Sequence, residues 1–212
     1  TALGFLWAVI NPCLIALVIT FVFSFVMRAE IKNFPLFILS GILPWFFFSN
    51  SFSESASALR QNQDILNKFA MAKEIVPLSV AMSNLLHLMV GLAVIIPFFV
   101  FFNPAVALGL LLLPVALLIF FLFTLGVCLW LSILAVYSRD VSVFLNVGTN
   151  FLFWITPVFY DTSVIPARYH WVIQCNPLSS FIRIFQALLY EGSFGNPYWW
   201  GISFILAVVS LA

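Results

Sequence analysis

Charged side chains are scarce in this sequence, and that scarcity decides its broad class. Of the 212 residues, 7% are charged and 64% are hydrophobic, whereas a typical soluble domain has about 25% charged residues. A soluble fold of this size would expose large apolar patches. The net charge of +1 gives no field that would attract nucleic acid. The composition therefore predicts a polytopic membrane protein.

Motifs that hold metals, nucleotides or catalytic groups are also missing. The three cysteines, Cys13, Cys128 and Cys175, have no CxxC or metal-ligand spacing, so we expect no metal site. No segment matches the phosphate-binding pattern GxxxxGK[ST]. The seven carboxylates are scattered, which argues against an enzyme acting on lipid-linked sugars, because such an enzyme needs clustered catalytic groups. We expect no enzyme activity and no cofactor bound by this chain.

Long apolar runs dominate what is present. Six runs are candidates for membrane spans, at about 5–27, 35–58, 77–102, 104–136, 141–160 and from 198 onward. A helix needs about 20 apolar residues to cross the hydrocarbon core, and irregular backbone cannot face lipid. We therefore expect an all-α fold of six transmembrane helices. The fourth run is long for one crossing and is expected to tilt, or to bend near Pro114 or Gly126.

The ends of the sequence and its basic residues bear on domain organisation and orientation. The sequence begins without methionine and stops inside an apolar run, so we expect a fragment of a longer protein, with 1–212 forming a single transmembrane domain. With residue 1 in the cytoplasm, four basic residues lie inside and four outside, so the positive-inside rule decides nothing. The loop between the second and third runs carries the densest basic cluster, which favours a cytoplasmic position for that loop.

One polar segment, residues 60–74, interrupts the apolar runs and carries three of the eight Lys and Arg residues. Apolar residues that include Leu66 and Phe69 recur on one side at helical spacing. Asp64 and Lys68 form an i,i+4 pair of opposite charge. A short amphipathic helix is expected here, which either docks on a partner protein or rests on the membrane surface.

Polar residues also occur inside the second run. Asn50, Glu54 and Ser57 recur at helical spacing, and a carboxylate at membrane depth costs several kcal/mol unless it faces water or a partner. This stripe is either a wall of an aqueous pathway or the interfacial end of a helix that leaves the membrane early. The aromatic run that begins at Trp45 is compatible with sugar stacking, although packing against lipid explains it equally well.

Two further runs contain isolated polar groups. Asn146 and Asn150 lie one turn apart in the fifth run, where they either bond to another helix or line a pathway. His87 in the third run either relays protons or makes a structural hydrogen bond. No second titratable group lies at helical spacing beside His87.

Residues 161–196 contain no full span but two proline-led segments. In the second segment an apolar face repeats at i, i+3, i+4 and i+7, and its members are Phe181, Ile184, Phe185 and Leu188. Asn176-Pro177 is predicted to begin this helix, with Asn as the N-cap. We expect an amphipathic helix at the outer leaflet or dipping into it, which either gates a pathway or is a surface loop.

Four stretches of the sequence, taken in order, form a recognisable set. They are Leu3-Gly4-Phe5-Leu6-Trp7 with Asn11-Pro12; Leu43-Pro44-Trp45-Phe46-Phe47 with Ile65-Leu66-Asn67-Lys68 and Glu74-Ile75-Val76-Pro77-Leu78-Ser79; Arg139-Asp140-Val141; and Pro157-Val158-Phe159-Tyr160 with Ile165-Pro166 and Asn176-Pro177-Leu178. Together they resemble the permease subunits of type 2 ATP-binding-cassette (ABC) exporters. The resemblance covers essentially the whole chain and is nearest to the branch that exports lipid-linked polysaccharides such as O-antigen, capsule and teichoic acid. Two departures are Met71-Ala72, where the family usually has Phe-Pro, and Gln186, where an Arg is common.

The resemblance implies that two permease copies pair in the bacterial cytoplasmic membrane, each binding a cytoplasmic ATPase that carries ATP and Mg²⁺. It also implies an interfacial helix before the first span. Contacts with the ATPase are expected at Arg60, Asp64, Leu66, Lys68, Phe69, Lys73, Glu74, Arg139 and Asp140. Pathway or gate residues are expected among Trp45, Asn50, Glu54, Ser57, Asn146, Asn150, Pro157, Tyr160, Asn176, Pro177 and Arg183. Arg139 and Asp140 otherwise fit an ordinary loop anchor. The alternative function is an ion-coupled secondary transporter that uses Glu54 or His87.

Overall fold

The computed structural model describes residues 2–22, 31–62, 72–137, 140–162 and 165–212. Within these ranges the secondary structure is all helical, as the sequence predicts. The long helices are α1 (Ala2–Thr20), α2 (Phe34–Gln61), α4 (Ile75–Phe102), α6 (Leu113–Tyr137), α7 (Asp140–Ile155) and α10 (Pro197–Leu211). The short ones are α5 (Val106–Gly109), the 3₁₀ turn η3 (Ala167–Tyr169), α8 (His170–Cys175), α9 (Pro177–Gln186) and the π-helical turn η4 (Ala187–Glu191).

Three of the helices are long and apolar enough to cross a membrane over their described residues. They contain the segments Phe34–Leu59, Ile75–Phe102 and Leu113–Ala135. At 1.5 Å per residue, the 16 residues of α7 and the 15 of α10 extend only roughly 24 and 22 Å, against about 30 Å of hydrocarbon. The second, third and fourth crossings are therefore supported by length and composition, whereas the first, fifth and sixth remain predictions.

The predicted run 104–136 is not one continuous helix. It divides into α5 and α6, with a turn at residues 110–112 between them. Pro114 is the second residue of α6. Backbone N–H groups in the first turn of a helix have no acceptor within the helix, so proline, which lacks this group, breaks no hydrogen bond there. The bend thus falls at the first of the two predicted places, since α6 passes through Gly126 without a break.

Gly126 has a different role, because it lets α6 and α10 approach closely. A Cβ built on this glycine would lie 2.4 Å from the backbone oxygen of Ser210 in α10. Trp130, one turn further along α6, donates a hydrogen bond from Nε1 to the same oxygen at 3.2 Å. The two helices therefore meet backbone to backbone, as small residues permit in membrane proteins.

Gly126→Val is expected to lower the free energy of unfolding by about 3 kcal/mol, because the added side chain must separate α6 from α10. Thermal unfolding of the detergent-solubilised protein measures the change. Gly201→Ala is the matched control: it lies in α10, and nothing lies within 4 Å of the Cβ it would add. Equal stability of the two variants would contradict the close packing.

Aromatic side chains form the core where α2, α6 and α9 meet. The ring centroids of Phe47 in α2 and Phe120 in α6 are 5.3 Å apart. Phe181 of α9 lies 4.8 Å from Phe120 and 4.8 Å from Phe123. All four rings are buried. Helix α9 consequently packs inside the bundle rather than resting on its surface. The four members of the predicted apolar face are buried, and so are residues on the other sides of α9, namely Leu178, Ser179, Ser180, Ile182 and Gln186.

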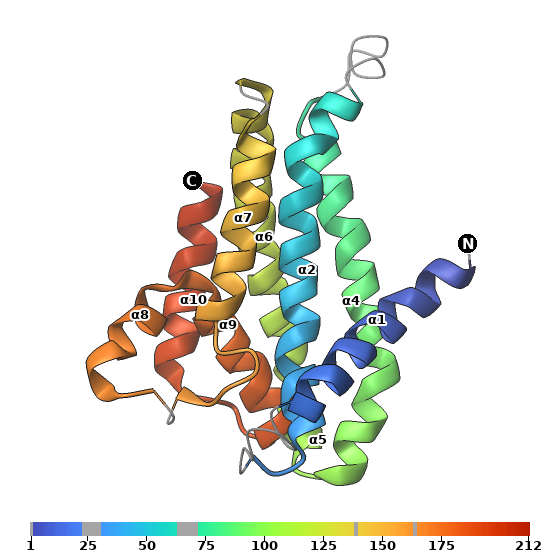
Figure 1. Cartoon of the computed structure of the whole chain (residues 1–212), viewed down its shortest axis with the longest axis vertical. Helices are drawn as coiled ribbons and strands as arrows, with labels where there is room; N and C mark the ends of the chain where they lie inside the picture. Colours follow the sequence, from blue (N-terminus) through green and yellow to red (C-terminus); the bar gives the residue numbers. More distant parts are fainter. Residues whose placement is uncertain (1, 23–30, 63–71, 138–139, 163–164) are drawn as a thin grey trace.

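Helices α2, α4, α6 and α7 run side by side and separate two ends of the molecule, whereas α1 crosses obliquely over α2 and α4 (Figure 1). The C-terminal end of α2, the start of α4, the end of α6 and the start of α7 lie at one end, at the top of the view. Helices α5, α8 and α9 lie toward the other end. We call these the coupling end and the external end. The two expected ATPase contacts, around residues 60–74 and 139–140, therefore adjoin elements that share one end.

Candidate functional site

Hydrogen bonds join residues 156–161, which follow α7, to helix α9. We call this contact the external junction. Asn176 forms its first half: its Oδ1 accepts from the backbone N–H of Leu178 at 3.0 Å and caps α9, as the sequence predicts. Its Nδ2 donates to the hydroxyl of Thr156 at 2.8 Å, and that hydroxyl donates to the carbonyl of Leu152 in α7 at 2.7 Å. One buried amide thereby ties the start of α9 to the last turn of α7.

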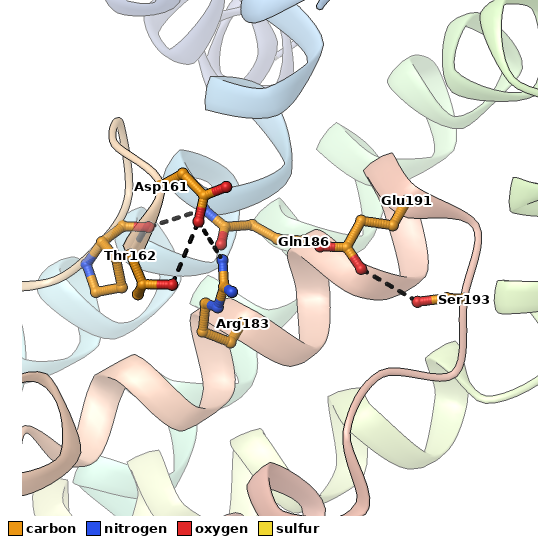
Figure 2. Close-up of polar contacts among 7 residues, drawn as sticks. Asp161, Thr162, Arg183, Gln186, Glu191 and Ser193 are labelled. Atoms are coloured by element: carbon orange, nitrogen blue, oxygen red, sulfur yellow. Dashed lines mark hydrogen bonds and ion pairs between the residues drawn. The ribbon is translucent and has the colours of Figure 1, made fainter. Parts of the chain in front are cut away.

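The other half of the junction lies at the end of α9 (Figure 2). Gln186 is fully buried, and its Nε2 donates to the carbonyl of Pro157 at 2.8 Å. Arg183, one turn earlier, pairs with Asp161 at 3.5 Å between Nη1 and Oδ1. Helix α9 is thus fastened at both ends to the segment that follows α7, and the two elements are expected to move together.

The junction is closed on its inner side by α2. A Cβ on Gly41 would lie 3.1 Å from the carbonyl of Val158 and 3.3 Å from Nε2 of Gln186. Tyr160 turns its hydroxyl back to α7 and donates to the carbonyl of Ile155 at 2.7 Å. One structural unit therefore contains five of the expected pathway or gate residues: Pro157, Tyr160, Asn176, Pro177 and Arg183.

The Arg183–Asp161 pair is partly exposed, with 22% and 45% of the two side chains accessible. Pairs of this kind stabilise by about 1 kcal/mol or less. Arg183→Asp is expected to lower the thermal midpoint by a few degrees, because it places two carboxylates together. The double exchange Arg183→Asp with Asp161→Arg should recover most of that loss. A double variant no more stable than the single one would show that the pair makes no contribution.

A second set of contacts binds the external ends of α2 and α4 to η4. The hydroxyl of Tyr190 donates to the carbonyl of Lys32 at 2.5 Å, and Nδ2 of Asn103 donates to the carbonyl of Tyr190 at 3.0 Å. Burial raises the pKa of Tyr190, and the charges of Glu191 and Asp161 add to that effect. The phenol therefore stays protonated and keeps its hydrogen bond at neutral pH.

A polar cavity of about 230 Å³ lies between α1, α2 and α4. Glu54 of α2 accepts a hydrogen bond from Nδ2 of Asn84 in α4 at 2.9 Å. His87 of α4 and Asn50 of α2 also line the cavity. The structure thus brings together Glu54 and His87, the two titratable groups that the sequence places on different spans. Asn84 links α4 to α2 through its hydrogen bond with Glu54.

The other pathway candidates are placed as follows. Ser57 is half-buried and donates to the backbone carbonyl of Glu54 at 3.1 Å. Asn150 lies on the exposed side of α7, whereas the side chain of Asn146 is outside the described part. Trp45 is buried, with its ring 5.3 Å from that of Phe153, so it belongs to the contact between α2 and α7.

The expected ATPase contacts are only partly described. Lys73 and Glu74 are exposed just before α4. Arg60 lies in the last turn of α2 and Asp140 begins α7, but their side chains are outside the described residues. The remaining contacts, Asp64, Leu66, Lys68, Phe69 and Arg139, also lie outside the described residues. Docking through this segment therefore stays a prediction.

Sequence reasoning missed Gln186 and Asp161 as site residues. A signal existed for Gln186, because it follows Ile182 by four residues and so lies on a buried face of α9. A polar side chain on such a face needs a partner. No comparable local signal exists for Asp161, whose partner is 22 residues away in the sequence.

Three apolar helices of membrane length, and a polar cavity between α1, α2 and α4, fit a polytopic membrane protein. Comparison with known proteins agrees: the family described as ABC-2 type transporter matches residues 1–190. This chain belongs to that family, the type 2 ABC transporters.

Its relatives place it in the polysaccharide export branch. It is 32% identical to an O-antigen export system permease protein of Klebsiella pneumoniae, over 99% of this chain and 82% of the relative. It is 34% identical to an O-antigen export system permease protein of Myxococcus xanthus, over 89% of this chain and 74% of the relative. A polysialic acid transport protein of Escherichia coli is 34% identical over 31% of this chain and 26% of its own. The chain is accordingly a multi-pass inner-membrane permease subunit of this branch and not itself an enzyme.

Proposed function

We propose that this chain is one membrane half of an ATP-driven exporter that moves a lipid-linked polysaccharide outward across the cytoplasmic membrane. Two copies pair, and each binds a cytoplasmic ABC ATPase that holds ATP and Mg²⁺, while this chain binds no cofactor. The observation that carries the proposal is the match to an O-antigen export system permease along 99% of the chain.

The coupling we propose uses α2 as a lever. Closure of the ATPase dimer pushes the segment at residues 60–74, which connects α2 to α4. Helix α2 continues from that end to the external junction, where Gly41 lies against Val158 and Gln186. Because helices resist compression along their axes, a shift at the coupling end reaches the junction. Helix α9 and the end of α7 then move as one gate.

The pathway we propose follows the polar face of α2. Asn50 and Glu54 are exposed and Ser57 is half-buried in the isolated chain, and such groups at membrane depth are costly unless they meet water, substrate or protein. Asn150, and Asn146 one turn before it, would contribute from α7. In this arrangement the glycan passes polar side chains while its lipid anchor stays in the membrane.

The experiment is export in cells. With the ATPase replaced by a variant of its phosphate-binding lysine, surface glycan should disappear although the permease remains in the membrane. Dissipating the proton gradient at constant ATP should leave export intact. Export that continues without ATP hydrolysis would overturn the proposal.

A second candidate function is ion-coupled transport through Glu54 and His87, because the two groups line one cavity. It predicts the opposite result in the same experiment: export survives loss of the ATPase and stops when the proton gradient collapses.

A further inference from the structure

The polar cavity between α1, α2 and α4 lies at membrane depth. Glu54 precedes Leu59, the last residue of the membrane-length segment of α2, by five residues, or roughly 7.5 Å. Asn84 lies nine residues into α4, or roughly 13 Å. The cavity therefore starts in the half of the bundle nearest the coupling end and extends toward the middle.

Its polar side chains come from three helices. Asn11 belongs to α1, Asn50 and Glu54 to α2, and Asn84 and His87 to α4. All except Asn84 are exposed in the isolated chain. Amides and a carboxylate facing hydrocarbon would cost several kcal/mol, so this cavity must be filled by something that forms hydrogen bonds.

The lining excludes several occupants. Among the described residues no lysine or arginine lines the cavity, and the carboxylate of Glu54 repels anions, so a phosphate does not fit. The titratable lining groups are Glu54 and His87, and no group of three metal-ligating side chains occurs in the described ranges. A lipid tail would leave the amides without hydrogen bonds. Water can fill the empty cavity, and the ligand that could displace it and replace its hydrogen bonds is neutral and rich in hydroxyls.

The walls favour a sugar ring in particular. The amides of Asn11 and Asn50 both donate and accept, which matches hydroxyl groups. Glu54 accepts hydrogen bonds, and so does the side-chain oxygen of Asn84, whose Nδ2 already donates to Glu54 and to the carbonyl of Val80. Phe46 and Phe47 line the same cavity and offer apolar surface to the C–H face of a pyranose. At about 230 Å³ the cavity is smaller than the ~300–1,000 Å³ of pockets for drug-sized ligands, so it accepts one ring rather than a chain.

We infer that this cavity is a binding subsite for a single neutral sugar ring of the exported glycan, held by Glu54, Asn84 and His87 against Phe46. The inference rests on the proposed function and names where the glycan first contacts the permease. The Glu54–Asn84 hydrogen bond orients the carboxylate toward the cavity before the ligand arrives. Binding here would select glycans by the hydroxyl pattern of one residue.

The test is photocrosslinking in cells that contain the full-length permease, its ATPase and their own glycan. Benzoylphenylalanine replaces Phe46 in the cavity, and in the control it replaces Leu118, an exposed apolar residue of α6. After irradiation the permease is purified, hydrolysed in acid and analysed for monosaccharides. Sugar is expected on the protein labelled at position 46 and not at position 118. Sugar on neither or equally on both, or only phospholipid at position 46, would overturn the inference.

A second measurement tests the polar contacts. Glu54→Leu, combined with the label at position 46, should lower the yield of crosslinked sugar at least about tenfold. The reason is that losing a hydrogen bond to a charged group weakens binding by about that factor or more. Glu54→Gln keeps an acceptor and should retain most of the yield. An unchanged yield in Glu54→Leu would contradict the subsite. Surface glycan measured in the same cells distinguishes failure of the subsite from failure of the proposed function. Export without crosslinking rejects the subsite alone. Absence of export with both wild-type subunits rejects the proposed function.

Discussion

Phe69→Asp is expected to abolish export and association with the ATPase, while the permease still inserts into the membrane. The helical spacing of the sequence predicts that Phe69 is on the apolar side of the polar segment at residues 60–74. A carboxylate there would be buried without a partner when the segment docks, which costs several kcal/mol and weakens binding about 1,000-fold for each 4 kcal/mol. Surface glycan and co-purification of the ATPase with the tagged permease measure the two effects.

Phe69→Leu is the matched control, since it keeps an apolar side chain and should retain the ATPase. Lys73→Ala tests the neighbouring charge; Lys73 is exposed just before α4, and its loss should weaken association only slightly. Normal co-purification of the ATPase with Phe69→Asp would contradict docking through this segment and favour the alternative in which it rests on the membrane surface.

Gln186→Glu is expected to destabilise the external junction more than any other single change in it. The side chain is fully buried, and its Nε2 donates to the carbonyl of Pro157 at 2.8 Å. A carboxylate would face that carbonyl without a counter-charge, at a cost of about 3–5 kcal/mol. Thermal unfolding in detergent should show the loss at pH 8. Part of the stability should return at pH 5, where a protonated acid donates to the carbonyl again.

Gln186→Met serves as the control because it keeps the volume and removes only the hydrogen bond, a loss of about 1 kcal/mol. Met should therefore be more stable than Glu at pH 8, with the difference shrinking as the pH falls. Equal stability of the two variants at pH 8 would mean that α9 is not fastened to Pro157 in the membrane protein.

Local patterns in the sequence predicted the parts of the structure that depend on neighbouring residues. The all-α class followed from apolar run length, and the start of α9 followed from Asn176-Pro177. The four apolar residues of the repeat from Phe181 to Leu188 are buried, as their spacing indicates. Each of these features is decided within a few turns of helix, where spacing is informative.

The contacts between helices could not be predicted in the same way. Glu54 and Asn84 are 30 residues apart, and Gln186 and Pro157 are 29 apart. Nothing in their local spacing links them. The burial of α9 was missed for a similar reason: an amphipathic pattern suits a membrane surface and a groove between helices equally well. Apolar composition continues through residues 110–112, so the sequence predicts a bend near Pro114 but not the full break between α5 and α6.

Reconstitution tests the central claim most directly. The permease and its ATPase are placed together in proteoliposomes with a radiolabelled lipid-linked glycan, and the fraction of glycan moved across the membrane is measured. We predict movement that needs both chains and hydrolysable ATP and that continues when a protonophore is added. Movement by the permease alone, driven by an imposed proton gradient, would contradict the account.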